Sequence, residues 1–489
     1  MESLPPELFN AIATRLAYLD WCALRLTCKA LYRATLPVFT SRYFQRIHVL
    51  VTPEGIADLK ALASRETIRP AVQDLCLILP LSRNHDLPLA EFTEAHYKVY
   101  KATHAAHLMF AQSDSVVSNI AECLAQFDNL RSIGLDAYPL ARFPRRGKPA
   151  ACLGLRGLER GPLYSLFEQK LVRHSQRPHP SYNWLGANHP VWNKVLTSVL
   201  QALCMVSSSV AIQRLYTCSL RWNVVLPAAY LTFSKPLYEP LAFCLRDLRV
   251  LEVCLGPGSP EDAREDCLPG LITRAAPTLR TLKLFQWAQM QDSSPDIFAD
   301  LAPQIRFSRL VRLHLHWVEV TQSDFALFLR SAAPSLRVLT LVALNLKDHL
   351  PDSLERSTVL KAIWRNFRNI LQVTIPSIHV FAMTRISCRR HQLCFTKSCR
   401  EGQSPSSTIK HFSRLVSFPL DYFSYHANQT PTTFADWLDT LDLDPETPLA
   451  RDLPVLSAGS HSLRIGNPVP NLGDEVNKAA AETFELGSP

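Results

Sequence analysis

Leucines recur through the middle of this chain in the pattern leucine-x-x-leucine-x-leucine, most clearly in copies that begin at Leu248, Leu279, Leu310 and Leu336. The starting positions lie 26 to 31 residues apart. The alternate leucines that end each copy would fall on one side of a short strand. Between copies the apolar residues have helical spacing, and a proline such as Pro277 ends the helix before the next strand. Each copy therefore predicts one helix followed by one strand.

The joins between these predicted helices and strands also repeat, as APTLR at residues 276–280 and APSLR at residues 333–337. One helix–strand unit cannot bury its own apolar face, so neighbouring units would stack and share a continuous core. The pattern resembles the leucine-rich repeat in a long, irregular form. A compact α/β domain in which the leucine spacing is incidental is the alternative. Weaker copies begin at Val72, Leu130, Ile212 and Ile370.

The first forty residues predict three short helices. Leu8 and Ile12 lie four residues apart, as on one side of a helix. Asp20 is a favourable N-cap for the second helix, and the third, over residues 29–36, would end before Pro37. A unit this small cannot bury so many large apolar side chains by itself, which predicts a partner surface.

This N-terminal stretch resembles the F-box. The likeness is carried by Leu-Pro-x-Glu at residues 4–7, by Leu-Asp at residues 19–20, and by Leu-x-Cys-Lys-x-Leu at residues 26–31. It departs where the family often has a bulky aromatic residue, because this chain has Leu31 followed by Tyr32. The resemblance implies docking on the Skp-family adaptor of a cullin–RING ubiquitin ligase. The residues that it assigns to this contact are Leu4, Pro5, Leu8, Ile12, Leu16, Leu19, Leu24, Cys28 and Leu31.

The predicted fold class is α/β, with an N-terminal three-helix F-box followed by an irregular leucine-rich-repeat-like α/β solenoid. Longer gaps between the upstream copies predict surface insertions, which cost little stability. An acidic amphipathic helix after the last copy would cap the open end of the array. The predicted limits are 1–46 for the F-box, 47–400 for the repeat region with insertions at about 138–192, 401–456 for a C-terminal cap region and 457–489 for a flexible tail.

Composition narrows the location and the partners. The 489 residues include 52 basic and 43 acidic ones, and this mild excess does not indicate a nucleic-acid partner. Thirteen scattered cysteines and the absence of a secretory signal predict reduced thiols in a cytoplasmic or nuclear protein. The uncharged residues 195–213 are interrupted by Gln201 and three serines, so they predict a buried helix, a turn and a strand rather than a membrane span.

The chain offers no recognisable catalytic or cofactor motif. Glycine is scarce, with 15 residues in 489, and no Gly-x-Ser-x-Gly or His-Glu-x-x-His sequence occurs. The densest group of metal-ligand residue types lacks the paired spacing of strong zinc sites, so we expect no metal and no cofactor. That group is Cys388, His391, Cys394, Cys399 and His411.

The residues that alternate with the repeat leucines would point to the other side of each strand, where a solenoid forms its concave binding surface. A mixed row with an exposed aromatic residue and two histidines suits recognition of a protein better than catalysis. Ordinary solvated strand residues are the alternative. The predicted target-binding residues are Glu252, Cys254, Lys283, Phe285, Arg312, His314, His316 and Thr340.

Together these features resemble an F-box substrate receptor, which would recruit a target protein to a ubiquitin ligase and carry out no chemistry itself. An F-box scaffold that acts outside ubiquitination is the first alternative. An enzyme in the irregular middle of the chain is the second, and it would require a pocket of converging polar groups for which the sequence has no motif.

Overall fold

The computed structural model divides the chain into two compact units, which are described separately below. The first unit is Met1–Arg173, Tyr182–Pro295 and Arg306–Arg309, and the second is His174–Ser181, Asp296–Ile305 and Leu310–Pro489. No helix among the described residues is both long and apolar enough to cross a membrane. The structure describes residues 12, 15–16, 18–78, 94–136, 152–154, 189–206, 211–217, 226–227, 238–256, 267–286, 297–347, 356–383, 386–388, 391–393, 423–441 and 443.

The first unit is built on a parallel sheet with the strand order β4-β1-β2-β3-β5-β7-β8, and β6 pairs with β7 beside it. Its strands are β1 (Arg46–Leu50), β2 (Asp74–Ile78), β3 (Ser132–Asp136), β4 (Cys152–Leu153), β5 (Arg214–Tyr216), β6 (Leu226–Pro227), β7 (Val250–Gly256) and β8 (Thr281–Gln286). Its helices are α2 (Tyr18–Thr27), α3 (Lys29–Phe44), α4 (Pro53–Ala63), η1 (Arg69–Ala71), α5 (Glu94–Gln112), α6 (Ser115–Leu124), α10 (His189–Met205), α11 (Tyr238–Cys244) and α12 (Cys267–Ala275).

The second unit has parallel strands in the order β9-β11-β13, with β16 added antiparallel to β13. A smaller sheet in the same unit has the order β10-β12-β14-β15. The strands are β9 (Arg312–His316), β10 (Glu319–Val320), β11 (Val338–Val342), β12 (Leu344–Leu346), β13 (Val380–Met383), β14 (Ile386–Cys388), β15 (His391–Leu393) and β16 (Phe423–His426). The helices are α13 (Ile297–Gln304), α14 (Gln322–Ala332), α15 (Arg356–Thr374) and α17 (Phe434–Asp439). Both units are α/β with mostly parallel sheets, which confirms the α/β part of the predicted fold class.

Shared carbonyls align neighbouring strands along the run β1-β2-β3-β5-β7-β8 of the first unit. The carbonyl of Gln73 accepts hydrogen bonds from the N–H groups of Arg131 and Ser132, both at 2.9 Å. The carbonyl of Arg249 accepts from Arg280 and Thr281 in the same way, at 2.8 and 2.9 Å. We call the residues at this position, immediately before a strand, the strand-start residues. Those of the first unit are Gln45, Gln73, Arg131, Gln213, Arg249 and Arg280.

The repeated APTLR and APSLR joins have the same structural role in the two units. Each proline lies two residues beyond the last helical residue, Ala275 or Ala332, and so outside the helix, as the spacing predicted. The next residue ties its repeat to the preceding one, because the Thr278 hydroxyl donates to the Leu248 carbonyl at 2.8 Å and the Ser335 hydroxyl donates to the Leu310 carbonyl at 3.1 Å. The leucine that follows is buried in both joins. The two sequence copies therefore have the same spacing because they form the same local geometry.

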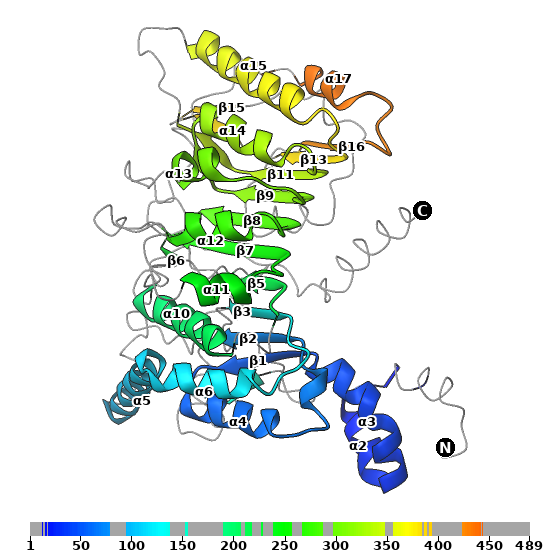
Figure 1. Cartoon of the computed structure of the whole chain (residues 1–489), viewed down its shortest axis with the longest axis vertical. Helices are drawn as coiled ribbons and strands as arrows, with labels where there is room; N and C mark the ends of the chain where they lie inside the picture. Colours follow the sequence, from blue (N-terminus) through cyan, green and yellow to red (C-terminus); the bar gives the residue numbers. More distant parts are fainter. Residues whose placement is uncertain are drawn as a thin grey trace. The chain divides into compact units, whose positions relative to one another are not determined.

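The repeat leucines form the core on the helix-bearing side of each sheet. Leu251 pairs with Leu282 in register, and Leu313 pairs with Leu339, and all four are buried. In the first unit α4, α6, α10, α11 and α12 follow the strands along one side (Figure 1), each next to the one before or after it. In the second unit α13, α14 and α15 do the same, with Phe325 of α14 stacked on a phenylalanine of α15 at 5.4 Å.

Two local predictions in the N-terminal helices are wrong. The helix predicted to stop at Pro37 continues through it to Phe44. Proline removes the backbone donor that would reach the Arg33 carbonyl, yet the helix continues, and in the following turn the Thr40 hydroxyl adds hydrogen bonds to the Leu36 and Pro37 carbonyls at 2.9 and 3.0 Å. Asp20 lies inside the first turn of α2 rather than at its N-cap, where its charge still suits the helix dipole.

Two predictions further along the chain also need correction. The copy predicted to begin at Ile370 is part of α15, because the apolar spacing of the helix continues through Phe367 and Leu371. The strand of that repeat is β13, one turn beyond the helix. The insertion predicted over residues 138–192 is mostly outside the described residues, but it contains β4, which pairs parallel with β1. The predicted tail 457–489 also lies outside them.

The opposite side of the first sheet, which no described helix covers and which we call the helix-free side, has one glycine whose identity is dictated by a neighbouring ring. A Cβ atom added to Gly134 on β3 would lie 2.3 Å from the ring of Tyr216 on β5. Tyr216 is 1% exposed, so the ring has little room to move away. Glycine at this position lets the tyrosine lie flat across β3 toward β2.

We expect Gly134→Ala to destabilise the first unit by about 1–3 kcal/mol, the usual cost of overpacking a filled site. Chemical denaturation of the purified chain measures this. Gly270→Ala is the matched control, because no atom lies within 4 Å of the added methyl group and alanine favours the helix. In a Tyr216→Ala background the cost of Gly134→Ala should largely disappear. An equal cost in both backgrounds would mean that the ring does not dictate the glycine.

Candidate functional site

The helix pair formed by α2 and α3 has a small hydrophobic core of its own, made by Trp21, Leu31 and Phe39. The Trp21 and Phe39 rings lie 6.0 Å apart, and the Arg25 guanidinium sits 3.9 Å from the centre of the Phe39 ring. Cys28 begins α3 as its N-cap, where its sulfur accepts a hydrogen bond from the Leu31 N–H at 3.4 Å. The pair is therefore held together without help from the leucines of the sheet.

The predicted adaptor residues divide between this core and the surface. Leu31 is buried at 9% exposure, so its side chain supports the helix pair from inside, and the expectation that it faces a partner is not met. Leu16, Leu24 and Cys28 are partly buried against the same core. Ile12 is 45% exposed. Leu4, Pro5, Leu8 and the side chain of Leu19 lie outside the described residues.

Sequence reasoning did not assign to the contact the two most exposed apolar side chains of the pair. Leu26 on α2 is 86% exposed and Tyr32 on α3 is 43% exposed. Leu26 belongs to the F-box-like motif and could have been chosen on that ground. Both side chains leave large apolar surface in water while the core beside them is complete. The candidate docking surface therefore consists of Leu26 and Tyr32 of the helix pair together with Ile12, which precedes α2.

A second candidate site lies on the helix-free side of the first sheet, around the Tyr216 ring. The Tyr216 hydroxyl donates to the Asp74 carboxylate at 2.9 Å and accepts from the Arg46 guanidinium at 3.3 Å. Arg46 closes the triangle through an ion pair of 3.1 Å with Asp74. These three residues come from β5, β2 and β1, so the ring bridges strands that are not direct neighbours.

A second ion pair extends this network toward β7. The Arg214 guanidinium lies 2.6 Å from the Glu252 carboxylate and 4.5 Å from the centre of the Tyr216 ring. Both carboxylates are largely covered, at 15% exposure for Asp74 and 16% for Glu252, whereas the arginines are 48% and 36% exposed. The network therefore presents guanidinium groups to solvent and keeps the carboxylates beneath them.

The surroundings change the proton affinities of this network in a consistent way. Burial raises the pKa of Tyr216 well above its ordinary value, and the nearby Cys76 and Asp74 add to that rise. Burial alone would lower the pKa of Arg46, but Tyr216 and Asp74 outweigh it and leave that pKa raised. The pKa of Arg214 is raised in the same manner, mainly by Glu252. The tyrosine stays neutral and the arginines stay charged, so the network is not a general acid–base pair at neutral pH.

The predicted target-binding row is brought together in register in the first unit, but part of it is buried. Glu252 pairs with Lys283, and Cys254 pairs with Phe285. Lys283 is half-buried and lies 5.1 Å from the Phe285 ring. Phe285 is only 4% exposed, so the expected exposed aromatic residue is not found there. The side chain of Cys254 lies outside the described residues.

The same row in the second unit is also only partly accessible. His314 pairs with Thr340, and Arg312 lies two residues before His314 on β9. Arg312 and His314 are half-buried, whereas His316 is 4% and Thr340 is 9% exposed. Alternation therefore places these residues opposite the leucines, as expected. It does not make each of them accessible, because packing on that side decides burial.

The described residues contain no group of three or more histidine, cysteine, aspartate or glutamate side chains arranged to hold a metal ion. Cys394, Cys399 and His411 of the loose cluster noted in the sequence lie outside these residues. A scan against protein-family models and a search of curated proteins both find no match for this chain. The functional argument therefore depends on the geometry of the helix pair and of the sheets.

We expect Tyr216→Phe to cost about 1–2 kcal/mol at neutral pH, because the Asp74 and Arg46 groups lose a buried partner. The pH dependence has a definite sign. The folded-state pKa of Tyr216 is raised, so its contribution is complete below the unfolded pKa of about 10 and is lost as pH rises beyond it. The unfolding free energy of the wild type should fall more steeply above about pH 10 than that of Tyr216→Phe. Urea titrations at several pH values measure these free energies. If the unfolding free energies of the wild type and of Tyr216→Phe have the same pH dependence, this assignment is contradicted.

Proposed function

We propose that this chain is an F-box-type substrate receptor that recruits a target protein to a Skp–cullin–RING ubiquitin ligase. The observation that carries the proposal is the exposed apolar surface of the N-terminal residues, namely Leu26 and Tyr32 of a helix pair that has its own core, and Ile12 before that pair. Together with the F-box-like motifs of residues 4–31, this supports an N-terminal unit built for a partner.

The energetics favour a partner over solvent. Burying a leucine side chain fully is worth about 1.5–3 kcal/mol, and Leu26 is nearly fully exposed in the isolated chain. Large apolar residues at the centre of an interface can contribute about 2–4 kcal/mol each. An adaptor that covers all three exposed side chains would gain from each of them without disturbing the Trp21–Leu31–Phe39 core.

We further propose that the two sheets belong to an irregular leucine-rich-repeat-like solenoid. The repeated shared carbonyls, the repeated hydroxyl ties of Thr278 and Ser335, and the helices along one side of each sheet support this interpretation. The target would bind on the helix-free side. The receptor would then act by raising the effective concentration of target lysines near a charged conjugating enzyme, and it would need no catalytic residue.

Introducing negative charges at exposed apolar side chains tests the adaptor contact. We expect Leu26→Glu combined with Tyr32→Glu to reduce capture of a purified Skp-family adaptor at least ten-fold, because both charges would be desolvated in the interface. Leu327→Glu is the matched control, since Leu327 is a comparably exposed apolar residue (43%) on α14 of the second unit. Thermal melts of all variants establish that each chain is folded.

The same preparation separates ligase function from scaffolding. If adaptor and cullin are captured together and a bound protein becomes ubiquitinated in a reconstituted reaction, the receptor proposal is supported. Adaptor capture without a cullin would favour an F-box scaffold instead. Wild-type-like capture by the double variant, or no capture by the wild type, would contradict the adaptor assignment.

A further inference from the structure

The strand-start residues of the first unit carry unusually uniform side chains. All six are glutamine or arginine, which are long and offer planar N–H donors. Gln45 and Gln73 join through their amides, with a hydrogen bond of 3.0 Å from Nε2 of the first to Oε1 of the second. Because the shared carbonyls repeat from strand to strand, these side chains leave the backbone at equivalent points along one edge of the sheet.

Three of these positions are exposed arginines, and two of the three are immediate neighbours. The N–H of Arg280 donates to the carbonyl of Arg249 at 2.8 Å, and the strands that they begin are adjacent. Adjacent strands lie ~4.8 Å apart, so two positive side chains start within about 5 Å of each other. Arg131 begins β3, two strands further along this edge, beyond Gln213 at the start of β5.

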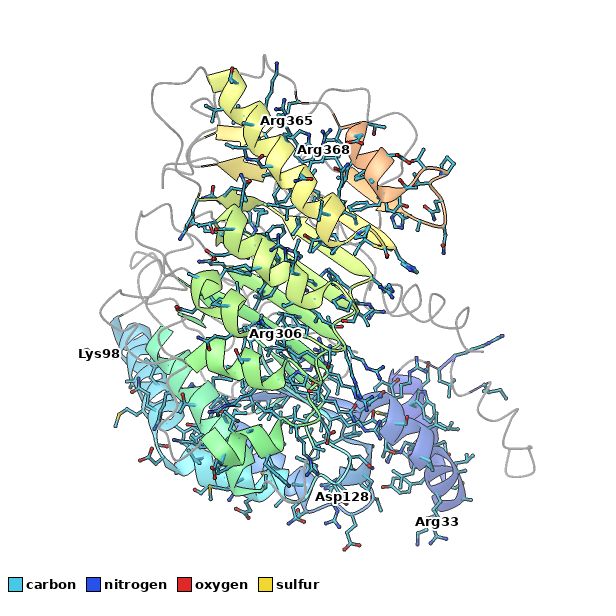
Figure 2. All side chains as sticks on the ribbon, turned by 45° about the horizontal axis from the view of Figure 1, so that its top comes forward. Arg33, Lys98, Asp128, Arg306, Arg365 and Arg368 are labelled. Atoms are coloured by element: carbon cyan, nitrogen blue, oxygen red, sulfur yellow. The ribbon has the colours of Figure 1, made fainter. Side chains whose placement is uncertain are left out.

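The positive charge of this row is not neutralised within the described residues, where Arg131, Arg249 and Arg280 form no ion pair. The carboxylates closest along the strands are already engaged, Asp74 by Arg46 and Glu252 by Arg214. In the turn before Arg249, Asp247 pairs with Arg246 at 3.5 Å. Asp128, which is labelled in Figure 2, is exposed in the turn three residues before Arg131. Side-by-side like charges are unfavourable for the folded chain by itself.

Glutamine shows that the fold does not require this charge. Gln45, Gln73 and Gln213 occupy the same backbone position with the same shared-carbonyl geometry. An uncharged amide therefore satisfies every local demand of the strand start. The arginines add only a row of forked donors, which suit bidentate contacts to carboxylates.

We propose that the arginine row of Arg131, Arg249 and Arg280 binds an acidic, extended segment of a partner protein. The row covers three strand-to-strand steps, or ~14 Å, which is about the length of four residues of extended chain. Alternate acidic side chains on such a segment would meet the guanidinium groups from one side. The strand-start residue between Arg131 and Arg249 is Gln213 and not an aromatic residue. The row itself therefore lacks the stacking surface that single-stranded nucleic acid uses. If the chain is a substrate receptor, as proposed above, this row defines part of the target's chemistry.

The test uses the full chain and a fluorescent poly-glutamate peptide, with binding followed by fluorescence anisotropy at low ionic strength. The site variant is Arg131→Gln/Arg249→Gln/Arg280→Gln, which installs the residue already present at the other strand starts. The control variant is Arg33→Gln/Arg330→Gln/Arg365→Gln, which removes the same charge from exposed arginines on α3, α14 and α15 (Arg33 and Arg365 are labelled in Figure 2).

We expect at least ten-fold weaker binding for the site variant and less than a two-fold change for the control. Equal weakening of the two variants, or no binding by the wild type, would overturn the proposal. Comparing the poly-glutamate peptide with one of alternating glutamate and phosphoserine shows whether the row prefers carboxylates or phosphates. Either preference supports an anionic segment as the ligand. Tighter binding of a single-stranded oligonucleotide that is lost in the site variant would overturn the choice of a protein partner. Adaptor capture, measured on the site variant, should be unchanged, so failure of the receptor proposal and failure of this one are distinguishable.

Discussion

The shared carbonyl at each strand start is the interaction on which the rest of the structure depends. One backbone oxygen receives two successive N–H groups from the next strand, so backbone hydrogen bonds alone define the register between neighbours. A slip of one residue would move every leucine to the helix-free side and every polar residue into the core. Leu251, Leu282 and their equivalents are buried because this register holds through the parallel strands of each unit.

The same register creates a second, more specific layer on the helix-free side of the first sheet. Tyr216 crosses β3 only because Gly134 leaves space, and its hydroxyl then reaches Asp74 and Arg46. This network joins strands that are far apart in the sequence, since Arg46 and Tyr216 are separated by 170 positions. A buried hydroxyl shared by a carboxylate and a guanidinium tolerates few alternative arrangements, so the network favours one alignment of the sheet.

Features that depend on local sequence could be predicted, and those that depend on distant partners could not. The copies beginning at Leu248, Leu279 and Leu336 led to real strands, because helical spacing, a proline and alternation are local signals. The strand predicted at Ile370 is wrong because the apolar spacing there also fits the helix that contains Ile370. Burial of Phe285 on the helix-free side depends on what packs there, which alternation cannot reveal. The Tyr216 network had one sequence signal, a glycine at a strand position in a chain with few glycines.

The second unit shows how the chain ends its repeats. Trp364 of α15 donates to the Leu441 carbonyl at 3.0 Å, and Arg368 pairs with Asp439 of α17 at 3.1 Å, on the side of α15 that faces α17 (Figure 2). Here an arginine on a packed surface has its carboxylate supplied by the chain. For the arginine row of the first unit, the described residues supply no paired carboxylate. Glutamine nevertheless occupies the same backbone position at the other strand starts. Arg46, Arg214 and Arg368 are thus paired with carboxylates of the chain, whereas the proposed acidic partner would supply the carboxylates for the exposed arginine row.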